Sequence, residues 1–172
     1  MGGCRPPRKK SRHMDKKVNE RSLSSDRMKV IIRTLRLALR SVRATQGAFL
    51  LRDDGTERLC FKAVVSRSGL SGYENVFCGL IGQRVQFGDG ITGQAAATGR
   101  AQIGKRSKNA DSFYTVSGDG TPESVMAIPI LSPDTVLGVI TAVSFDPDRE
   151  FGFADADLMC EYADVVSEVI QL

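Results

Sequence analysis

The sequence predicts an α+β fold in which an antiparallel sheet is covered on both faces. Residues 125–131 and 136–145 are two β-branched runs, and the segment 132–134 between them, Ser-Pro-Asp, has turn chemistry. This pattern is typical of a β-hairpin. Segments 25–43 and 155–172 carry apolar residues at helical spacing, so each predicts an amphipathic helix that can cover the sheet.

Both faces of this hairpin are apolar, unlike a sheet that is open to water on one side. Its first strand places Met126, Ile128 and Ile130 on one face, and Val125, Ala127 and Leu131 on the other. Pro129 cannot donate to a strand ladder, which predicts a bulge or an edge, and Gly138 allows another group to approach the backbone. We expect two covers for this sheet, one of which can be a small molecule.

Length and composition favour one domain of ordinary size with a hydrophobic core. The chain has 172 residues, of which 41% are hydrophobic. It contains no apolar run of membrane-spanning length and no signal peptide, so we expect a cytoplasmic protein. The four cysteines share no metal-binding or redox spacing, and we expect reduced thiols: Cys4, Cys60, Cys78 and Cys160.

The charge is divided unevenly along the chain. Residues 1–43 hold fourteen Lys or Arg and three Asp or Glu, a balance of +11, whereas the remainder holds ten and seventeen, a balance of −7. Residues 1–23 have almost no apolar side chains, so we expect a disordered basic tail, part of which, up to Met14, can be a cloning remnant. Binding of nucleic acid by this tail is the less favoured interpretation, because no aromatic residue accompanies its charges.

The two terminal helices have apolar stripes of different width. The first, capped by Ser24 or Ser25, has one stripe: Met28, Ile31, Ile32, Leu35, Ala38, Leu39 and Val42. The second has two: Leu158, Tyr162, Val165, Val169 and Leu172, and then Met159, Ala163, Val166 and Ile170. A helix with two apolar stripes needs two neighbours, so we expect a homodimer through helices 25–43 and 155–172. Burial of both stripes within one subunit is the alternative.

Two further strands are predicted at 47–52 and 58–66, joined by a glycine turn at 53–56. In the second, regular alternation places Leu59, Phe61, Ala63 and Val65 on one side, and Cys60, Lys62 and Val64 on the other. A long loop follows at 67–82. A short strand then leads into a glycine turn and a small helix from about Thr92 to Thr98, which Gly99 ends. These glycines match neither a phosphate loop nor a dinucleotide fingerprint.

From about residue 25 to 172 the chain resembles a GAF domain. The family's recurring phrases occur in order: Gly47-Ala48-Phe49-Leu50-Leu51, Phe87-Gly88-Asp89-Gly90-Ile91-Thr92-Gly93 with Ala97-Thr98-Gly99, Ser124-Val125-Met126-Ala127-Ile128-Pro129-Ile130, Val136-Leu137-Gly138-Val139-Ile140, and Phe153 with Asp157. The resemblance implies a GAF-like (PAS/profilin-like) antiparallel sheet of five or six strands, with terminal helices on one face and a pocket under loops and short helices on the other. It also implies a single sensory or regulatory domain over 24–172. Ala154 replaces the Ser or Thr that usually caps the last helix, and Asp155 can take over as cap.

The sequence argues against catalysis. The only histidine, His13, lies in the expected tail, so no Ser-His or Cys-His pair can form in the domain, and the usual ligand for haem, iron or zinc is missing. One enzymatic branch of the family, the free methionine-(R)-sulfoxide reductases, has reactive cysteines where this sequence has Gly82 and Thr92. Cys78 is nearby but out of register, so a thiol-based enzyme or redox sensor is a lesser alternative.

We expect a domain that binds an unidentified small molecule, requires no cofactor and signals as a dimer to a downstream signalling protein. A dimerisation module without a ligand is the first alternative. The ligand candidates are Phe87, Thr92, Ser112, Phe113, Tyr114, Met126 and Thr141. Lys105, Arg106 and Lys108 can meet an anion with help from backbone N–H groups of the 88–93 turn, although the signature of cyclic-nucleotide GAF domains is missing.

Overall fold

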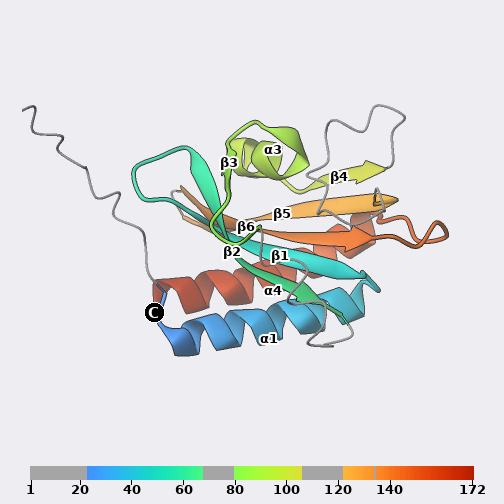
Figure 1. Ribbon diagram of the computed structural model, residues 1–172, viewed down its shortest axis with the longest axis horizontal. Helices are drawn as coiled ribbons and strands as arrows, with labels where there is room; N and C mark the ends of the chain where they lie inside the picture. Colours follow the sequence, from blue (N-terminus) through green and yellow to red (C-terminus); the bar gives the residue numbers. More distant parts are fainter. Residues whose placement is uncertain (1–22, 68–79, 106–121, 134) are drawn as a thin grey trace, which may run out of the picture.

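The chain folds around one antiparallel sheet. The computed structural model describes residues 23–67, 80–105, 122–133 and 135–172. Within them six strands form a sheet in the order β3-β2-β1-β6-β5-β4 (Figure 1). The strands are β1 Gln46–Arg52, β2 Arg58–Ser66, β3 Arg84–Gln86, β4 Gln102–Lys105, β5 Ser124–Ser132 and β6 Thr135–Ser144. The α+β class and the six-stranded antiparallel sheet agree with the prediction.

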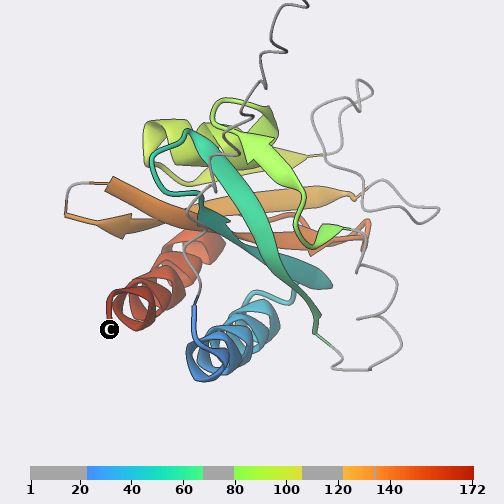
Figure 2. The ribbon, with the colours of Figure 1, turned by 60° about the vertical axis from the view of Figure 1, so that its left-hand side comes forward.

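Helices cover both faces of the sheet, as the apolar hairpin requires. The helices α1 Ser25–Ser41 and α4 Phe153–Gln171 lie side by side against one face, whereas α3 Gly90–Thr98 lies over the other (Figures 1 and 2). In sequence direction α1 and α4 are antiparallel, and the hydroxyl groups of Ser41 and Tyr162 are 2.8 Å apart. No helix in the described ranges combines the length and the apolar character that crossing a bilayer would require.

The sheet separates two hydrophobic clusters. The helix-side cluster includes Ile31, Leu35, Leu39, Phe49, Met126, Ile128, Ile140, Met159 and Val166. The α3-side cluster includes Ala48, Leu50, Leu59, Phe61, Val85, Ala95, Ala127 and Val139. Because successive side chains of a strand point to opposite faces, β1, β5 and β6 contribute to both clusters.

The β5–β6 hairpin has the predicted properties. Its register pairs Ser132 with Thr135 at the turn and shifts between Ile130 and Leu131. Pro129 lies next to this irregularity, beyond the segment of β5 that pairs with β4, so its missing N–H leaves no gap in a central ladder. A Cβ on Gly138 would lie 2.3 Å from the backbone oxygen of Leu50 in β1, and this close approach explains the glycine.

Strand β2 differs from the prediction because it contains a β-bulge. The register pairs Leu50 with Phe61 but Phe49 with Ala63, so Lys62 is the extra residue. Leu59 and Phe61 therefore face α3, whereas Ala63 and Val65 face the helix pair. The prediction of one continuous face through these four residues was wrong, because regular alternation does not continue across a bulge.

The helix ends mostly follow the predicted capping chemistry. The Ser24 hydroxyl accepts a hydrogen bond from the Arg27 N–H, and Gly99 adopts φ +63° at the end of α3. The Asp155 carboxylate accepts from the Gly152 N–H at 2.8 Å and thus compensates for Ala154. Three boundaries differ: α1 ends at Ser41 instead of residue 43, α3 begins at Gly90, and α4 begins at Phe153. The tail to residue 22 and most of the 67–82 loop lie outside the described residues.

Candidate ligand-binding cavity

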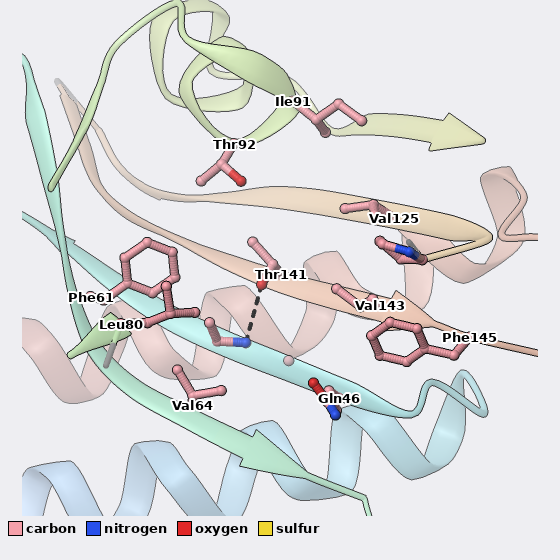
Figure 3. A pocket seen from close by; sticks show the side chains of 13 residues that line it. Gln46, Phe61, Val64, Leu80, Ile91, Thr92, Val125, Thr141, Val143 and Phe145 are labelled. Carbon is pink, nitrogen blue, oxygen red and sulfur yellow. Dashed lines mark hydrogen bonds between the residues drawn. The ribbon is translucent and has the colours of Figure 1, made fainter. Parts of the chain in front are cut away.

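A cavity lies between the sheet and α3, on the face opposite the helix pair (Figure 3). Its lining comes from four strands, from α3 and from single residues next to them: Gln46, Gly47, Ala48, Phe61, Val64, Leu80, Ile91, Thr92, Pro122, Val125, Thr141, Val143 and Phe145. It measures about 60 Å³ as the space open to the centre of a water molecule. A buried water needs roughly 10–15 Å³ on this scale, so the cavity has room for more than one.

Strand alternation explains which side chains reach the cavity. In β6, Thr141 and Val143 face the cavity. The alternate residues Ile140 and Ala142 face the other side of the sheet and pack in the helix-side core. In β2, the bulge at Lys62 brings Phe61 and Val64 to the cavity side of the sheet. The cavity wall therefore depends on the bulge as well as on the periodicity.

Three polar side chains interrupt an otherwise apolar lining. Thr141, 7% exposed, accepts a hydrogen bond on Oγ1 from the Ala48 N–H at 3.1 Å (Figure 3). Gln46, at the start of β1, is 6% exposed and has its side-chain amide at the cavity. Thr92 is half-buried in the first turn of α3. None of the lining residues that the structure describes carries a charge.

Two of the predicted ligand residues line the cavity and two do not. Thr92 and Thr141 are lining residues. Met126 is fully buried in the helix-side core, because it alternates with Val125, which is the β5 residue at the cavity. Phe87 packs against the edge of the α3-side cluster, with the Arg52 guanidinium 5.3 Å from its ring centre. Ser112, Phe113 and Tyr114 lie outside the described residues.

The predicted anion site is only partly described, and its described part is engaged elsewhere. The Lys105 ammonium forms an ion pair with Glu150, and Arg106 and Lys108 fall in the undescribed range. In the glycine turn, the N–H of Gly88 donates to the Gly93 oxygen and that of Asp89 to the Gln86 oxygen. These two N–H groups therefore stabilise the turn itself, and the anion site stays a prediction.

Sequence reasoning missed several lining residues, above all Gln46. The alternation of β1 was a usable signal, since Gln46 shares a face with Ala48 and Leu50. The predicted strand began one residue later, at 47, so Gln46 was never assigned a face. Leu80 and Pro122 had no periodic signal, because they lie outside the strands. They are the first described residues after the ranges 68–79 and 106–121.

The described cysteines show no activated thiol. Cys60 is buried in β2, and burial raises the pKa of the Cys160 thiol in α4, with further increases from the carboxylates of Asp164 and Asp157. Cys78 lies outside the described residues. Within the described ranges, no cluster of three or more His, Cys, Asp or Glu residues could hold a metal ion.

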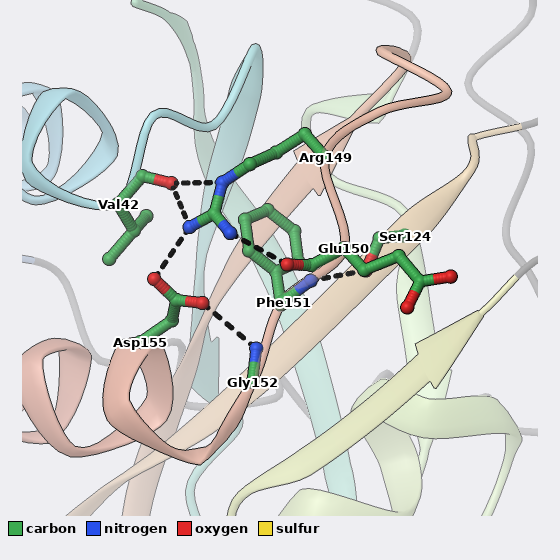
Figure 4. A network of polar contacts seen from close by, with 7 residues as sticks. All are labelled: Val42, Ser124, Arg149, Glu150, Phe151, Gly152 and Asp155. Atoms are coloured by element: carbon green, nitrogen blue, oxygen red, sulfur yellow. Dashed lines mark hydrogen bonds and ion pairs between the residues drawn. The ribbon is translucent and has the colours of Figure 1, made fainter.

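A polar network connects the end of the sheet to the helix pair (Figure 4). The Arg149 guanidinium donates to the Val42 backbone oxygen at the end of α1, at 2.8 and 3.2 Å, and forms an ion pair with Asp155 at 2.5 Å. The Phe151 N–H donates to the Ser124 hydroxyl at 3.0 Å, at the start of β5. The segment between β6 and α4 is thus fixed to both terminal helices and to the sheet.

An antiparallel sheet with a helix pair on one face and a cavity on the other defines an α+β domain with a candidate ligand-binding site. The model of the GAF domain family matches residues 26–171. The chain belongs to the GAF family, whose domains are sensory or regulatory modules that bind small molecules.

Solved structures agree with this assignment at the level of the fold. The second GAF domain of DevS from Mycobacterium smegmatis is 20% identical, with a TM-score of 0.65 over 85% of this chain and 94% of that one. The GAF domain of a two-component sensor histidine kinase from Bacillus halodurans is 19% identical, with a TM-score of 0.62 over 87% and 95%. The free methionine-R-sulfoxide reductase from Neisseria meningitidis is 21% identical, with a TM-score of 0.66 over 86% and 80%. A comparison with curated proteins found no match.

Proposed function

We propose that this GAF domain binds a small molecule in the cavity between the sheet and α3, and that it signals through α1 and α4 as a homodimer. The observation that carries the proposal is the hollow on one face of the strands whose other face supports the helix pair. A module for dimerisation alone would have no use for this hollow, and large side chains would be expected to fill it.

Native mass spectrometry of freshly purified protein tests binding. We expect a retained small molecule, which is lost when Val125→Phe fills the cavity and kept when Leu131→Phe enlarges an exposed residue of the same strand. Val125 lines the cavity, whereas Leu131 is 44% exposed. A wild-type protein that retains no molecule, and that no compound library stabilises against heat, would favour the dimerisation module.

The outer surface of the helix pair supports a homodimer. Four apolar side chains are between 45% and 83% exposed there: Val30, Leu37, Val165 and Leu172. The α1 segment holds five Lys or Arg and one Asp, whereas α4 holds five Asp or Glu and no Lys or Arg. A two-fold axis that places α1 of one copy on α4 of the other would pair opposite charges around a shared apolar centre.

Light scattering at micromolar concentration tests the dimer. We expect twice the monomer mass for the wild type, and the monomer mass for Leu37→Glu, which places a charge in the proposed contact. Leu131→Glu on the β5–β6 hairpin is the matched control and should remain dimeric, because its side chain lies beside Gly99 at the end of α3, on the other face of the sheet. A wild-type monomer at these concentrations would contradict this part of the proposal.

We further propose that the domain acts by binding and not by catalysis. The described lining offers apolar groups, two hydroxyls and an amide, none of which is a nucleophile activated by a neighbouring base. Free methionine-(R)-sulfoxide supplied with a thiol reductant should therefore not be turned over. Turnover that disappears on Cys78→Ser would instead establish the redox alternative.

A further inference from the structure

The side chain of Gln46 is a polar group of a buried residue, and its amide faces the cavity. Gln46 is 6% exposed, and its side chain lies at the cavity in Figure 3. No hydrogen bond between the described residues uses its amide nitrogen or oxygen, and these atoms are not among the fully enclosed polar atoms that lack a partner, so they face the open space of the cavity. Buried amides are almost always hydrogen-bonded, because leaving one unpaired costs free energy. The Gln46 amide is therefore available to hydrogen-bond a partner that enters the cavity.

The chemistry of the amide restricts what that partner is. A glutamine amide presents an acceptor oxygen and two N–H donors in one plane. The best complement is a planar group with an N–H beside a carbonyl oxygen, as in a lactam or a ring imide, because it can form two parallel hydrogen bonds. Thr141 adds a hydroxyl whose oxygen already accepts from the Ala48 N–H, which leaves its hydrogen available to the same guest.

The walls of the cavity restrict the charge of the partner. The described lining beside Gln46, Thr92 and Thr141 consists of a glycine and nine apolar residues, including the aromatic rings of Phe61 and Phe145. A charged guest would lose its hydration here without an opposite charge among these groups, which is unfavourable. Lys105, the described member of the predicted anion site, is paired with Glu150.

We infer that the cavity takes an uncharged, mostly apolar ring molecule with one lactam-type edge, and that Gln46 recognises this edge. The inference rests on the proposed function, because it assigns a ligand class to the same cavity. It also distinguishes this domain from one that binds anions such as cyclic nucleotides, because Gln46 carries no charge that could balance a phosphate.

Four probes of similar size test the inference by isothermal titration and thermal shift. They are isoquinolin-1-one, which has the lactam edge; its N-methyl derivative, which lacks the N–H; naphthalene, which has neither polar group; and 1-naphthoate, which is anionic. We expect wild-type protein to bind isoquinolin-1-one about tenfold more tightly than the N-methyl derivative or naphthalene, as two hydrogen bonds to a buried amide allow. The anionic 1-naphthoate, and cyclic GMP as a fifth and larger probe, should bind more weakly than every neutral probe.

Gln46→Leu is the matched variant, since it keeps the approximate volume and removes the amide. It should abolish the preference for isoquinolin-1-one and leave naphthalene affinity within about twofold of wild type, which assigns the loss to the amide and not to a collapsed cavity. If the variant does not fold, the ratio of the wild-type affinities for isoquinolin-1-one and for its N-methyl derivative still tests recognition of the lactam edge.

The outcomes separate this inference from the proposed function. Equal wild-type affinity for the lactam and naphthalene would overturn recognition by Gln46, while binding in the cavity would stand. Tighter binding of 1-naphthoate or cyclic GMP would overturn the neutral ligand class in the same way. Failure of all probes to bind would overturn the inference, and the native mass spectrum of Val125→Phe against Leu131→Phe would then judge the proposed function independently.

Discussion

Gly138 shows how a single residue sets the spacing of the central strands. A Cβ there would lie 2.3 Å from the Leu50 oxygen, a distance that real contacts do not reach. Gly138→Ala should therefore lower the free energy of unfolding by about 1–3 kcal/mol, because β1 and β6 must separate to admit the methyl group. Urea denaturation followed by circular dichroism measures the effect, and Val136→Ala in the same strand should cost less. An unchanged midpoint for Gly138→Ala would show that the strands can adjust.

Cys160 gives a prediction about pH. Burial raises the pKa of its thiol, and Asp164 and Asp157 raise it further, so less thiolate is present near neutral pH than in an ordinary cysteine. Alkylation by iodoacetamide, followed by peptide mass spectrometry, should be slower at Cys160 than in a model peptide, and its rate should rise at higher pH. Asp164→Asn should accelerate the reaction at pH 8, whereas the exposed and distant Asp148→Asn should not. Equal alkylation rates in the wild type and both variants would contradict a contribution of the Asp164 carboxylate to the pKa of the Cys160 thiol.

At the scale of single residues, the sequence predicts the face of the sheet on which a side chain lies better than it predicts the role of that side chain. Val125 and Met126 are both apolar β5 residues, and only the layer that packs on each face makes one a cavity residue and the other a core residue. Thr141 was predictable because it interrupts an apolar strand. For Gln46, alternation in β1 indicated the face but not the burial, since a polar residue at the end of a strand is ordinarily exposed; in the folded chain it pairs with Val143 of β6.

Among the elements, β2 offers a test of the bulge. Lys62 is the extra residue, so its deletion restores regular alternation while Phe61 and Ala63 keep their faces. The Lys62 deletion should fold with a cooperative transition. The Cys60 deletion should not, because it turns the residues on one side of the gap to the wrong face. Thermal unfolding of both variants, with one-dimensional proton spectra, distinguishes them. Equal damage from the two deletions would refute the bulge as the determinant of the faces.

The start of α4 depends on Asp155, which combines a helix cap with an ion pair. Its carboxylate accepts from the Gly152 N–H and meets Arg149, and both charged side chains are about four-fifths buried, with exposures of 21% and 15%. Asp155→Asn should lower the free energy of unfolding by about 1–2 kcal/mol. Asp157→Asn, on the exposed side of the same helix, should stay within about 0.5 kcal/mol. Equal effects in urea titrations would show that the network contributes little.

The elements themselves were largely predictable from the sequence. Helical and strand periodicity located α1, α4, β1, β2, β5 and β6 to within two residues at most ends, because their burial is one-sided or alternating. The bulge was not predictable, since Lys62 fits a regular polar position in the pattern. The pairing of β1 with β6, which joins the two hairpins, was not predicted, because contacts between distant segments leave no periodic signal.

For the whole molecule, the opposite charges of α1 and α4 predict an exchange of partners. Variant A carries Arg33→Glu and Arg40→Glu, and variant B carries Glu161→Arg and Glu168→Arg. In the proposed contact each variant places like charges opposite one another, so each alone should dissociate at least tenfold more readily at low salt. Mixed together, A and B should form a heterodimer, because the acidic α1 of A then meets the basic α4 of B. Native mass spectrometry resolves the species, and homodimers of A that persist unchanged would contradict this arrangement.

The alternation of β6 has a thermodynamic consequence for such an assembly. Thr141 and Val143 line the cavity, while Ile140 and Ala142 pack in the helix-side core. Strand β6 is therefore a wall that the cavity and the helix-side core share. A guest that moves this wall must alter how readily the subunits associate, and association must then alter guest affinity by the same factor. Protein concentration would thus become a variable in every binding titration, and two titrations at different dilutions would measure how strongly the two events are linked.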